Sequence, residues 1–306
     1  MKRLVCFILT IISSFFIFGC TSSDDNKINI VAVSFSDYEF CKQVTQNLDY
    51  FNVHYLLKNG EDAHSYQATF QDKMLFSKAD LVVYSGGEST AWIDSLLSND
   101  CKVVKYSEFL TPICLDDQTE DHSEEHNHLV DEHYTLSIKN AIKIVEEIEK
   151  SLSEIDKKHS RLFAENAYLY TQNLQALDSE YEILKSGETS TVIVCDRQPF
   201  SYLFNDYNIT CFSALKGCSS EIDCSFSTIV DLADKLNEYS LNSVLVTESA
   251  KLDIANSVIS RSGKSGVQIL TLNSMQSIKL SDNKNYIDIC RENLQVLKNC
   301  LGVNNG

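Results

Sequence analysis

The chain has 306 residues, of which 43% are hydrophobic and 23% are charged. This composition excludes a disordered chain and predicts one or two packed cores. Acidic residues outnumber basic ones by 43 to 26, for a formal net charge of -17. Because phosphate backbones are bound by Lys and Arg, nucleic acid is a poor partner for this chain, and a cation is favoured.

The N-terminus has the pattern of an exported lipoprotein. Two basic residues precede an apolar stretch at 4–18, which is too short to span a membrane comfortably and is typical of a secretory signal. The end of this stretch, Ile17-Phe18-Gly19-Cys20, resembles a bacterial lipobox. We therefore expect a signal peptide at 1–19, acylation of Cys20 and a polar tether at 20–27. The alternative is an ordinary signal peptide with a chance cysteine.

The cysteines do not form a recognisable motif. Of the eleven, Cys6 would leave with the signal peptide and Cys20 would carry lipid, so nine remain and at least one thiol is free. No Cys-x-x-Cys pair occurs, which argues against a zinc ribbon or a thioredoxin-type site. Most of the cysteines lie in apolar runs and are expected to be small buried residues. Pairing of Cys218 with Cys224 stays open.

Short β-rich runs alternate with helical segments, which predicts parallel sheets covered by helices. Four runs lie in each half of the chain, so we expect an α/β protein with two lobes, each a four-stranded parallel sheet with flanking helices. The strands are expected at 28–34, 51–57, 80–85, 102–106, 191–195, 209–215, 243–247 and 267–272. The helices are expected at 37–47, 71–78, 89–97, 226–239, 250–260 and 285–301.

A helical linker is expected between the lobes. Apolar residues recur at helical spacing over 136–149, and no Pro or Gly interrupts 151–185. A helix over the second stretch would reach roughly 50 Å and join the lobes as one long rigid helix. A coiled-coil dimerisation helix is the alternative, but sustained heptads are not evident, so we expect a monomer. The predicted domains are an N-terminal lobe at 28–135, a helical linker at 136–187 and a C-terminal lobe at 188–306.

Histidines mark the candidate metal-binding segments. His64 and His133 both lie in expected turns beside acidic residues, where α/β folds place ligand sites, although a single loop histidine more often has no such role. The acidic loop at 116–130 holds three more histidines. Imidazole and carboxylate suit zinc and similar ions, so the loop is either an accessory metal-binding segment or a solvated acidic surface loop. These three are His122, His126 and His128.

Six short motifs occur in order along the chain. They are Gly60-Glu61-Asp62-Ala63-His64-Ser65-Tyr66, Ser85-Gly86-Gly87-Glu88-Ser89-Thr90-Ala91-Trp92, the His-rich loop, Asp131-Glu132-His133, Arg197-Gln198-Pro199-Phe200-Ser201-Tyr202-Leu203 and Gly217-Cys218-Ser219-Ser220-Glu221-Ile222-Asp223. Together with the lipobox and the central helix, they resemble the metal-binding lipoproteins of zinc and manganese ABC importers. The resemblance covers essentially the whole mature chain and implies two α/β lobes that hold a metal ion between them.

The resemblance also implies a ligand set. His64 and His133 match the two positions of the N-terminal lobe. A third family histidine would fall near Arg197, which cannot ligate because it stays protonated. Glu221 is therefore expected to replace it, and Glu248 to take the carboxylate position. Arg197 would orient one of these carboxylates, or else form a salt bridge at the surface or between the lobes.

The expected function is that of an extracytoplasmic, lipid-anchored binding protein. It would capture zinc, with manganese as the alternative, and deliver it to an ABC permease and its ATPase. An enzyme is not expected, because no His-Glu-x-x-His or Gly-x-Ser-x-Gly motif occurs. A surface adhesin is a further alternative. A siderophore or vitamin binder of similar shape would not need the paired histidines.

Overall fold

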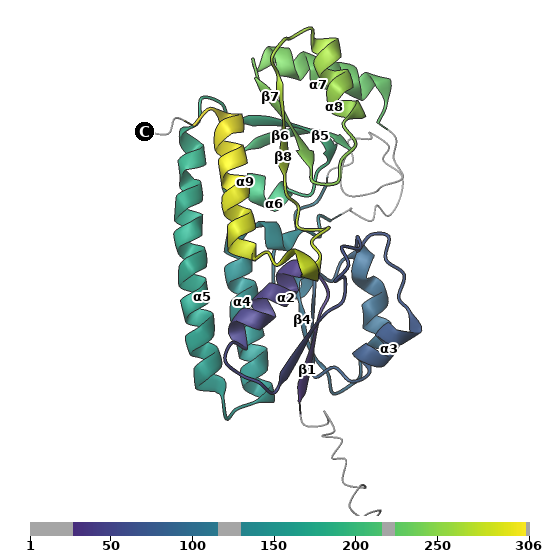
Figure 1. Ribbon diagram of the computed structural model, residues 1–306, viewed down its shortest axis with the longest axis vertical. Coiled ribbons are helices and arrows are strands. Elements are labelled where there is room, and N and C mark those ends of the chain that lie inside the picture. The colour runs from purple at the N-terminus through teal and green to yellow at the C-terminus, as the bar shows by residue number, and fades with distance from the viewer. Residues whose placement is uncertain (1–26, 116–129, 216–223, 304–306) are drawn as a thin grey trace, which may run out of the picture.

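The computed structural model describes residues 27–115, 130–215 and 224–303. Two four-stranded parallel sheets form two lobes stacked along the long axis (Figure 1). The strand orders are β2-β1-β3-β4 and β6-β5-β7-β8. The strands are β1 (Ile28–Ala32), β2 (Phe51–Tyr55), β3 (Leu81–Tyr84), β4 (Lys102–Lys105), β5 (Thr191–Arg197), β6 (Thr210–Leu215), β7 (Ser243–Thr247) and β8 (Gln268–Leu272). The predicted α/β class with two parallel sheets is confirmed.

The central strands form because they can be buried on both faces. Every residue of β3 and of β7 is buried, as expected for parallel strands covered by helices. The helices around the N-terminal sheet are α2 (Phe35–Val44), α3 (Phe70–Phe76) and a 3₁₀ helix (Glu88–Leu96). Those of the C-terminal lobe are α6 (Ser201–Asp206), which was not predicted, α7 (Phe226–Glu238), α8 (Asp253–Ser262) and α9 (Tyr286–Leu301).

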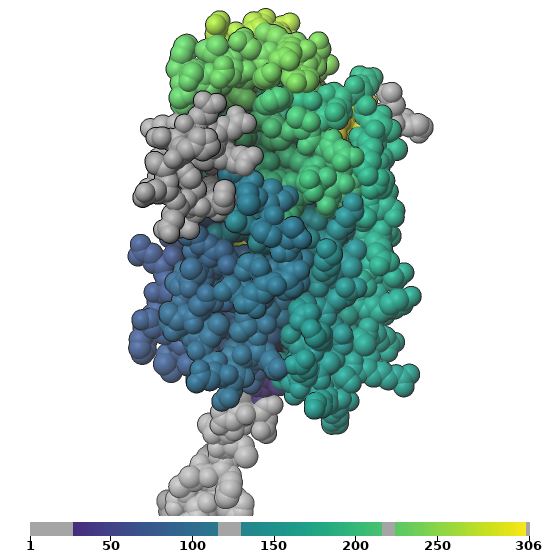
Figure 2. Space-filling view, turned by 180° about the vertical axis from the view of Figure 1, so that it is seen from behind, coloured from purple at the N-terminus to yellow at the C-terminus, as the bar shows by residue number. Residues whose placement is uncertain are grey.

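Two helices connect the lobes. The chain descends through α4 (Ile138–Ile155), turns, and returns through α5 (Ser160–Tyr181), which packs against α4 and α9 (Figure 1). From the opposite side, the teal residues of this part of the chain run alongside both lobes (Figure 2). The 22 residues of α5 reach about 33 Å.

The expectation of an unbroken helix from residue 151 was wrong. The side chain of Asp156 ends α4, because its Oδ1 accepts a hydrogen bond from the amide of Lys158 at 3.1 Å. Its Oδ2 contacts His159 Nδ1 at 2.6 Å and accepts the hydroxyl of Tyr50 at 2.8 Å. The turn is therefore fixed by a side chain next to β2, which the helical pattern of 151–185 does not reveal.

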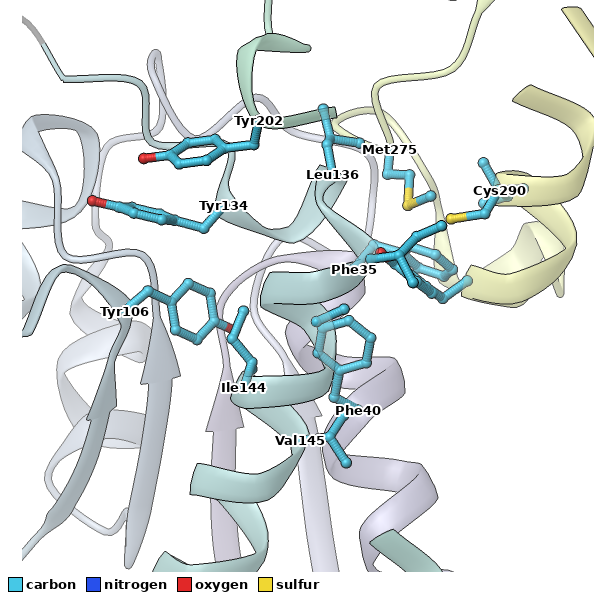
Figure 3. Packing of buried hydrophobic residues seen from close by; sticks show 14 of the residues in the cluster. Phe35, Phe40, Tyr106, Tyr134, Leu136, Ile144, Val145, Tyr202, Met275 and Cys290 are labelled. Carbon is cyan, nitrogen blue, oxygen red and sulfur yellow. The ribbon is translucent and has the colours of Figure 1, made fainter. Parts of the chain in front are cut away.

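The lobes share part of their core. One cluster of buried side chains includes Phe40 of α2, Ile144 of α4, and Cys290 of α9 (Figure 3). Tyr134 and Tyr202 lie against each other in the same region, with ring centroids 4.9 Å apart. A second cluster lies within the C-terminal lobe, between its sheet and α7 and α8. Because close-packed cores resist deformation, the shared cluster favours a fixed arrangement of the lobes.

The segment after β8 also attaches the C-terminal lobe to the N-terminal one. Asn59 and Lys279 form an antiparallel bridge, and the amide of Leu280 donates to the carbonyl of Lys58 at 2.9 Å. The hydroxyl of Tyr55 donates to the carbonyl of Ile278 at 2.8 Å. Across the described ranges, no helix is both long and apolar enough to span a bilayer.

Candidate metal centre

A cavity lies between the lobes, next to the carboxyl ends of the N-terminal strands. Its wall is formed by segments after β1, β2 and β3, by the segment before α4, and by the segment after β8. This is the edge at which open parallel sheets bind ligands. The lining residues used below are His64, Ser89, Glu132, His133, Ser274 and Gln276.

His64 is positioned by the turn that follows β2. The Oδ1 atom of Asp62 accepts a hydrogen bond from the amide of His64 at 3.0 Å, and the amide of Ser65 donates to the carbonyl of Asp62 at 3.1 Å. Asp62 Oδ2 pairs with Arg197 Nη1 of β5 at 2.8 Å. Burial raises the pKa of Asp62, but the hydrogen bonds from Arg197 and His64 outweigh it, and the pKa lies below its usual value. Arg197 thus holds the His64 turn across the cleft.

His133 is oriented by a buried carboxylate. Asp131 is 2% exposed, and its Oδ1 lies 2.7 Å from His133 Nδ1 and 2.8 Å from the amide of His133. Burial raises the pKa of Asp131, but the charge and hydrogen bonds of His133 outweigh this effect, so the pKa lies below its usual value. The ionised carboxylate places the proton on Nδ1 and leaves a lone pair on Nε2, which is the arrangement found for metal-ligating histidines.

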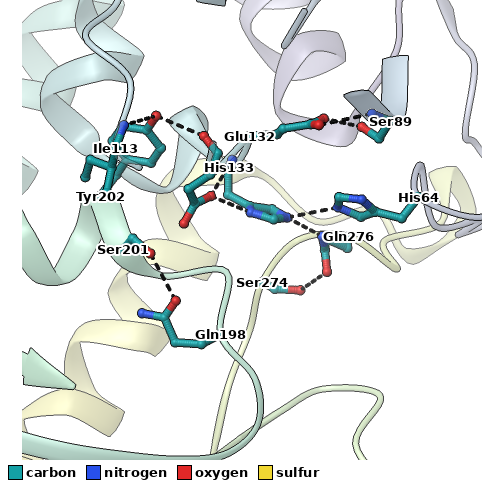
Figure 4. A network of polar contacts seen from close by, with 11 residues as sticks. His64, Ser89, Ile113, Glu132, His133, Gln198, Ser201, Tyr202, Ser274 and Gln276 are labelled. Atoms are coloured by element: carbon teal, nitrogen blue, oxygen red, sulfur yellow. Dashed lines mark hydrogen bonds and ion pairs between the residues drawn. The ribbon is translucent and has the colours of Figure 1, made fainter. Parts of the chain in front are cut away.

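The two imidazoles meet in the cavity. His64 Nε2 lies 3.4 Å from His133 Nε2, and both rings point into the same space (Figure 4). Two nitrogens bound to one tetrahedral zinc ion at 2.0–2.1 Å would lie about 3.3 Å apart. The separation of these atoms therefore fits a shared zinc ion without movement of either backbone.

Glu132, between Asp131 and His133, points away from the imidazoles. Its carboxylate accepts hydrogen bonds from the amide and hydroxyl of Ser89, the first at 3.0 Å (Figure 4). A Cβ atom on Gly87 would lie 2.1 Å from Glu132 Cδ, so only glycine leaves room for this carboxylate. The Gly-Gly motif after β3 thus anchors the segment that carries His133.

Gln276 is a site residue that the sequence reasoning missed. It lies in the segment after β8, and its Nε2 lies 2.6 Å from His133 Nε2 (Figure 4). Glutamine is not a common metal ligand, and only its place after a strand of the C-terminal sheet could have marked it. The side chains that meet at the imidazole nitrogens thus come from both lobes.

The structure does not bring Glu248 to the two histidines. Its Oε2 accepts the amide of Ser274 at 2.8 Å, and its Oε1 accepts the hydroxyls of Ser274 at 2.9 Å and Ser277 at 3.1 Å. Within 27–115, 130–215 and 224–303, no third His, Cys, Asp or Glu joins His64 and His133 in a metal-binding group. Arg197 pairs with Asp62, and this is the salt bridge between lobes that the sequence left as an alternative.

Other predicted residues lie outside the described ranges. They are Cys20, His122, His126, His128, Cys218 and Glu221.

Two α/β lobes, a connecting pair of helices and paired imidazoles in the cleft define the class of two-lobed solute-binding proteins. Residues 30–300 match the family model described as "Zinc-uptake complex component A periplasmic". The chain belongs to this family, as the sequence motifs indicated.

Individual relatives agree with this assignment. The chain is 30% identical to the zinc-binding lipoprotein AdcA of Streptococcus pneumoniae, in a match that covers 97% of this chain and 61% of AdcA. It thus spans about three-fifths of the length of that relative. It is 24% identical to the high-affinity zinc uptake system protein ZnuA of Bacillus subtilis, covering 92% of this chain and 90% of ZnuA. The crystal structure of the Zn(II)-bound ZnuA-like domain of S. pneumoniae AdcA superposes with a TM-score of 0.72 at 27% identity, covering 90% of this chain and 99% of that domain.

Proposed function

We propose that this protein is the zinc-capturing component of an ABC importer and that His64 and His133 bind the ion in the interlobe cleft. The observation that carries the proposal is the 3.4 Å separation of the two Nε2 atoms, with Asp131 fixing the tautomer of His133. When both Nε2 atoms are unprotonated, the pair would direct two nitrogen lone pairs at one point, which is the chemistry that zinc prefers.

Zinc is proposed over manganese for two reasons. Nitrogen ligands favour zinc, whereas manganese prefers sites made mainly of oxygen. The relatives named above are described as zinc-binding or zinc-uptake proteins. Glu221 remains the sequence-based proposal for a carboxylate ligand from the C-terminal lobe.

The protein would act by binding and release rather than by catalysis, since the family is that of an uptake component. Zinc binds when both imidazoles are unprotonated, and the loaded protein then presents it to the permease, whose ATPase drives transport. The shared core and the Asn59–Lys279 bridge favour small shifts of side chains and loops over a wide opening of the lobes. The protein would work as a monomer.

The site of action is proposed to be the outer side of the cytoplasmic membrane or the periplasm. The lipobox-like end of 1–19 supports export, cleavage before Cys20 and a lipid anchor. The loop at 116–130 would gather zinc near the cleft, a role that deletion of residues 118–129 tests through uptake at scarce zinc. Unchanged zinc uptake after this deletion would contradict the role proposed for the loop.

Metal content and growth test the function together. The purified mature protein, loaded in a mixture of zinc and manganese, should retain about one zinc per chain in elemental analysis, and competition titration should rank zinc first. A deletion strain should fail to grow under chelation and recover with added zinc. Preferential binding of manganese, or loss of surface adhesion with normal zinc uptake, would contradict the proposal.

A further inference from the structure

The turn between α4 and α5 carries a cluster of basic side chains. Lys157, Lys158 and Arg161 lie within five residues, and no other five-residue stretch of the chain holds three Lys or Arg. All three residues are exposed. Because the chain as a whole has 43 acidic and only 26 basic residues, this turn has the opposite sign to the rest of the protein. We call these three residues the basic turn.

The acidic side chains beside the basic turn do not cancel its charge. The side chain of Asp156 is 14% exposed and is directed at His159, with Oδ2 2.6 Å from Nδ1. Glu154 pairs with Lys102 at 2.6 Å. In the part of the chain that the structure describes, no residue of the basic turn forms an ion pair. The exposed carboxylate of Asp49, in the loop before β2, therefore leaves a net positive charge at this end.

Helix stability accounts for only part of this arrangement. Lys157 and Lys158 follow the C-terminal end of α4, where the helix dipole favours cations. Arg161 lies in the first turn of α5, where the same effect favours an acidic residue and disfavours a cation. Its place beside the two lysines is thus unfavourable for the helix and favours a role outside it.

The basic turn lies at the end of the molecule where the tether joins the N-terminal lobe. The amide of Ile28, at the start of β1, donates to the carbonyl of Tyr50 at 3.0 Å, and the hydroxyl of Tyr50 donates to Asp156 Oδ2 at 2.8 Å. The start of β1 and the α4–α5 turn both lie at the lower end of the view in Figure 1. The eight residues 20–27 reach at most about 29 Å, so a chain anchored at Cys20 keeps this end near the bilayer.

We propose that the basic turn is a membrane-contact surface, which binds the anionic head groups of the bilayer that holds the lipid anchor. Each Lys or Arg close to such a surface strengthens binding by about fivefold, and the tether keeps the local concentration of head groups high. The inference rests on the anchoring proposed above and adds an orientation to it. The 18 residues of α4 separate the turn from the zinc cleft by about 27 Å, so the cleft stands away from the head groups.

Labelling of lysine side chains tests the contact. The mature chain, with a hexahistidine tag in place of residues 1–20, is held on nickel-chelating lipid in vesicles of phosphatidylcholine with or without phosphatidylglycerol. The tether is then supplied whether or not Cys20 is acylated. Acetylation of Lys157 and Lys158, read by mass spectrometry, should be at least about fivefold slower on the anionic vesicles. High salt should remove this protection, and the exposed Lys251 after β7 should react equally on both vesicles.

Two charge reversals give a matched pair of variants. Arg161→Glu should abolish the protection of Lys157 and Lys158, and the variant should fold because an acidic residue is favourable in the first turn of α5. Arg261→Glu makes the same change of charge at an exposed position of α8 and should leave the protection as in the wild type.

Several results would overturn the inference. Equal acetylation of the two lysines on both kinds of vesicle, or an equal loss of protection in both variants, would contradict a membrane contact. Protection that appears on neutral vesicles as well, and only at high protein density, would assign the basic turn to the acidic surface of a second copy. Zinc affinity of the soluble Arg161→Glu protein should equal that of the wild type, so the zinc site and the membrane contact can fail separately.

Discussion

Replacing Asp131 by Asn should weaken zinc binding while the protein stays folded. The substitution keeps the shape of a side chain that is 2% exposed but removes the charge 2.7 Å from His133 Nδ1. A neutral partner makes His133 Nε2 a poorer ligand and no longer selects one tautomer. Outer partners of this kind typically contribute about 10–100-fold to metal affinity, which corresponds to about 1.4–2.8 kcal/mol.

The chain offers a matched control for this experiment. Asp156 and His159 form a similar pair at the α4–α5 turn, with Oδ2 and Nδ1 2.6 Å apart. Asp156→Asn should affect thermal stability but not zinc affinity, whereas Asp131→Asn should affect both. Competition titration at neutral pH, with circular dichroism to confirm folding, measures the two effects. Wild-type affinity in folded Asp131→Asn protein would refute the role assigned to this carboxylate.

Three further outcomes follow from the same contacts. His64→Ala and His133→Ala should each remove most of the zinc affinity in a competition titration. A variant that binds zinc as the wild type does would show that the substituted histidine is not a ligand. Arg197→Gln breaks the 2.8 Å pair with Asp62, so it should weaken zinc binding. The free energy of unfolding, measured in a urea titration, should change by only about 1 kcal/mol. Unchanged zinc affinity would show that the pair does not position His64. Because the folded-state pKa values of Asp62 and Asp131 are lowered, their stabilisation is fully present above the carboxyl pKa of the unfolded chain, about 3.9, and is lost as the pH falls through the lower folded values. Acid unfolding of Asp131→Asn should therefore depend less on pH than that of the wild type, and parallel curves would contradict this.

The sheets could be predicted from sequence because their signal is local. Buried runs such as those of β3 and β7 are rich in Val and Leu and are bounded by turn residues, so all eight strands were placed within about two residues of their ends. The end of α4 could not be placed in this way. It depends on Asp156 meeting Tyr50, a residue more than a hundred positions away in the chain.

The site residues also differ in whether a local sequence pattern marks them. His64 and His133 could be recognised because histidine beside acidic residues in a turn is a local pattern. The direction of the Glu248 side chain could not, because it is set by Ser274 and Ser277 in the segment after the next strand. Gln276 was missed since its contact with His133 joins residues 143 positions apart, and its residue type carries no metal signal.

The most direct test is the location of the metal in crystals of the zinc-loaded mature protein, determined from anomalous scattering at the zinc edge. The account predicts one peak in the interlobe cleft, about 2.0–2.1 Å from both His64 Nε2 and His133 Nε2. A peak that only one of these nitrogens reaches, or zinc bound elsewhere with the two imidazoles empty, would contradict it.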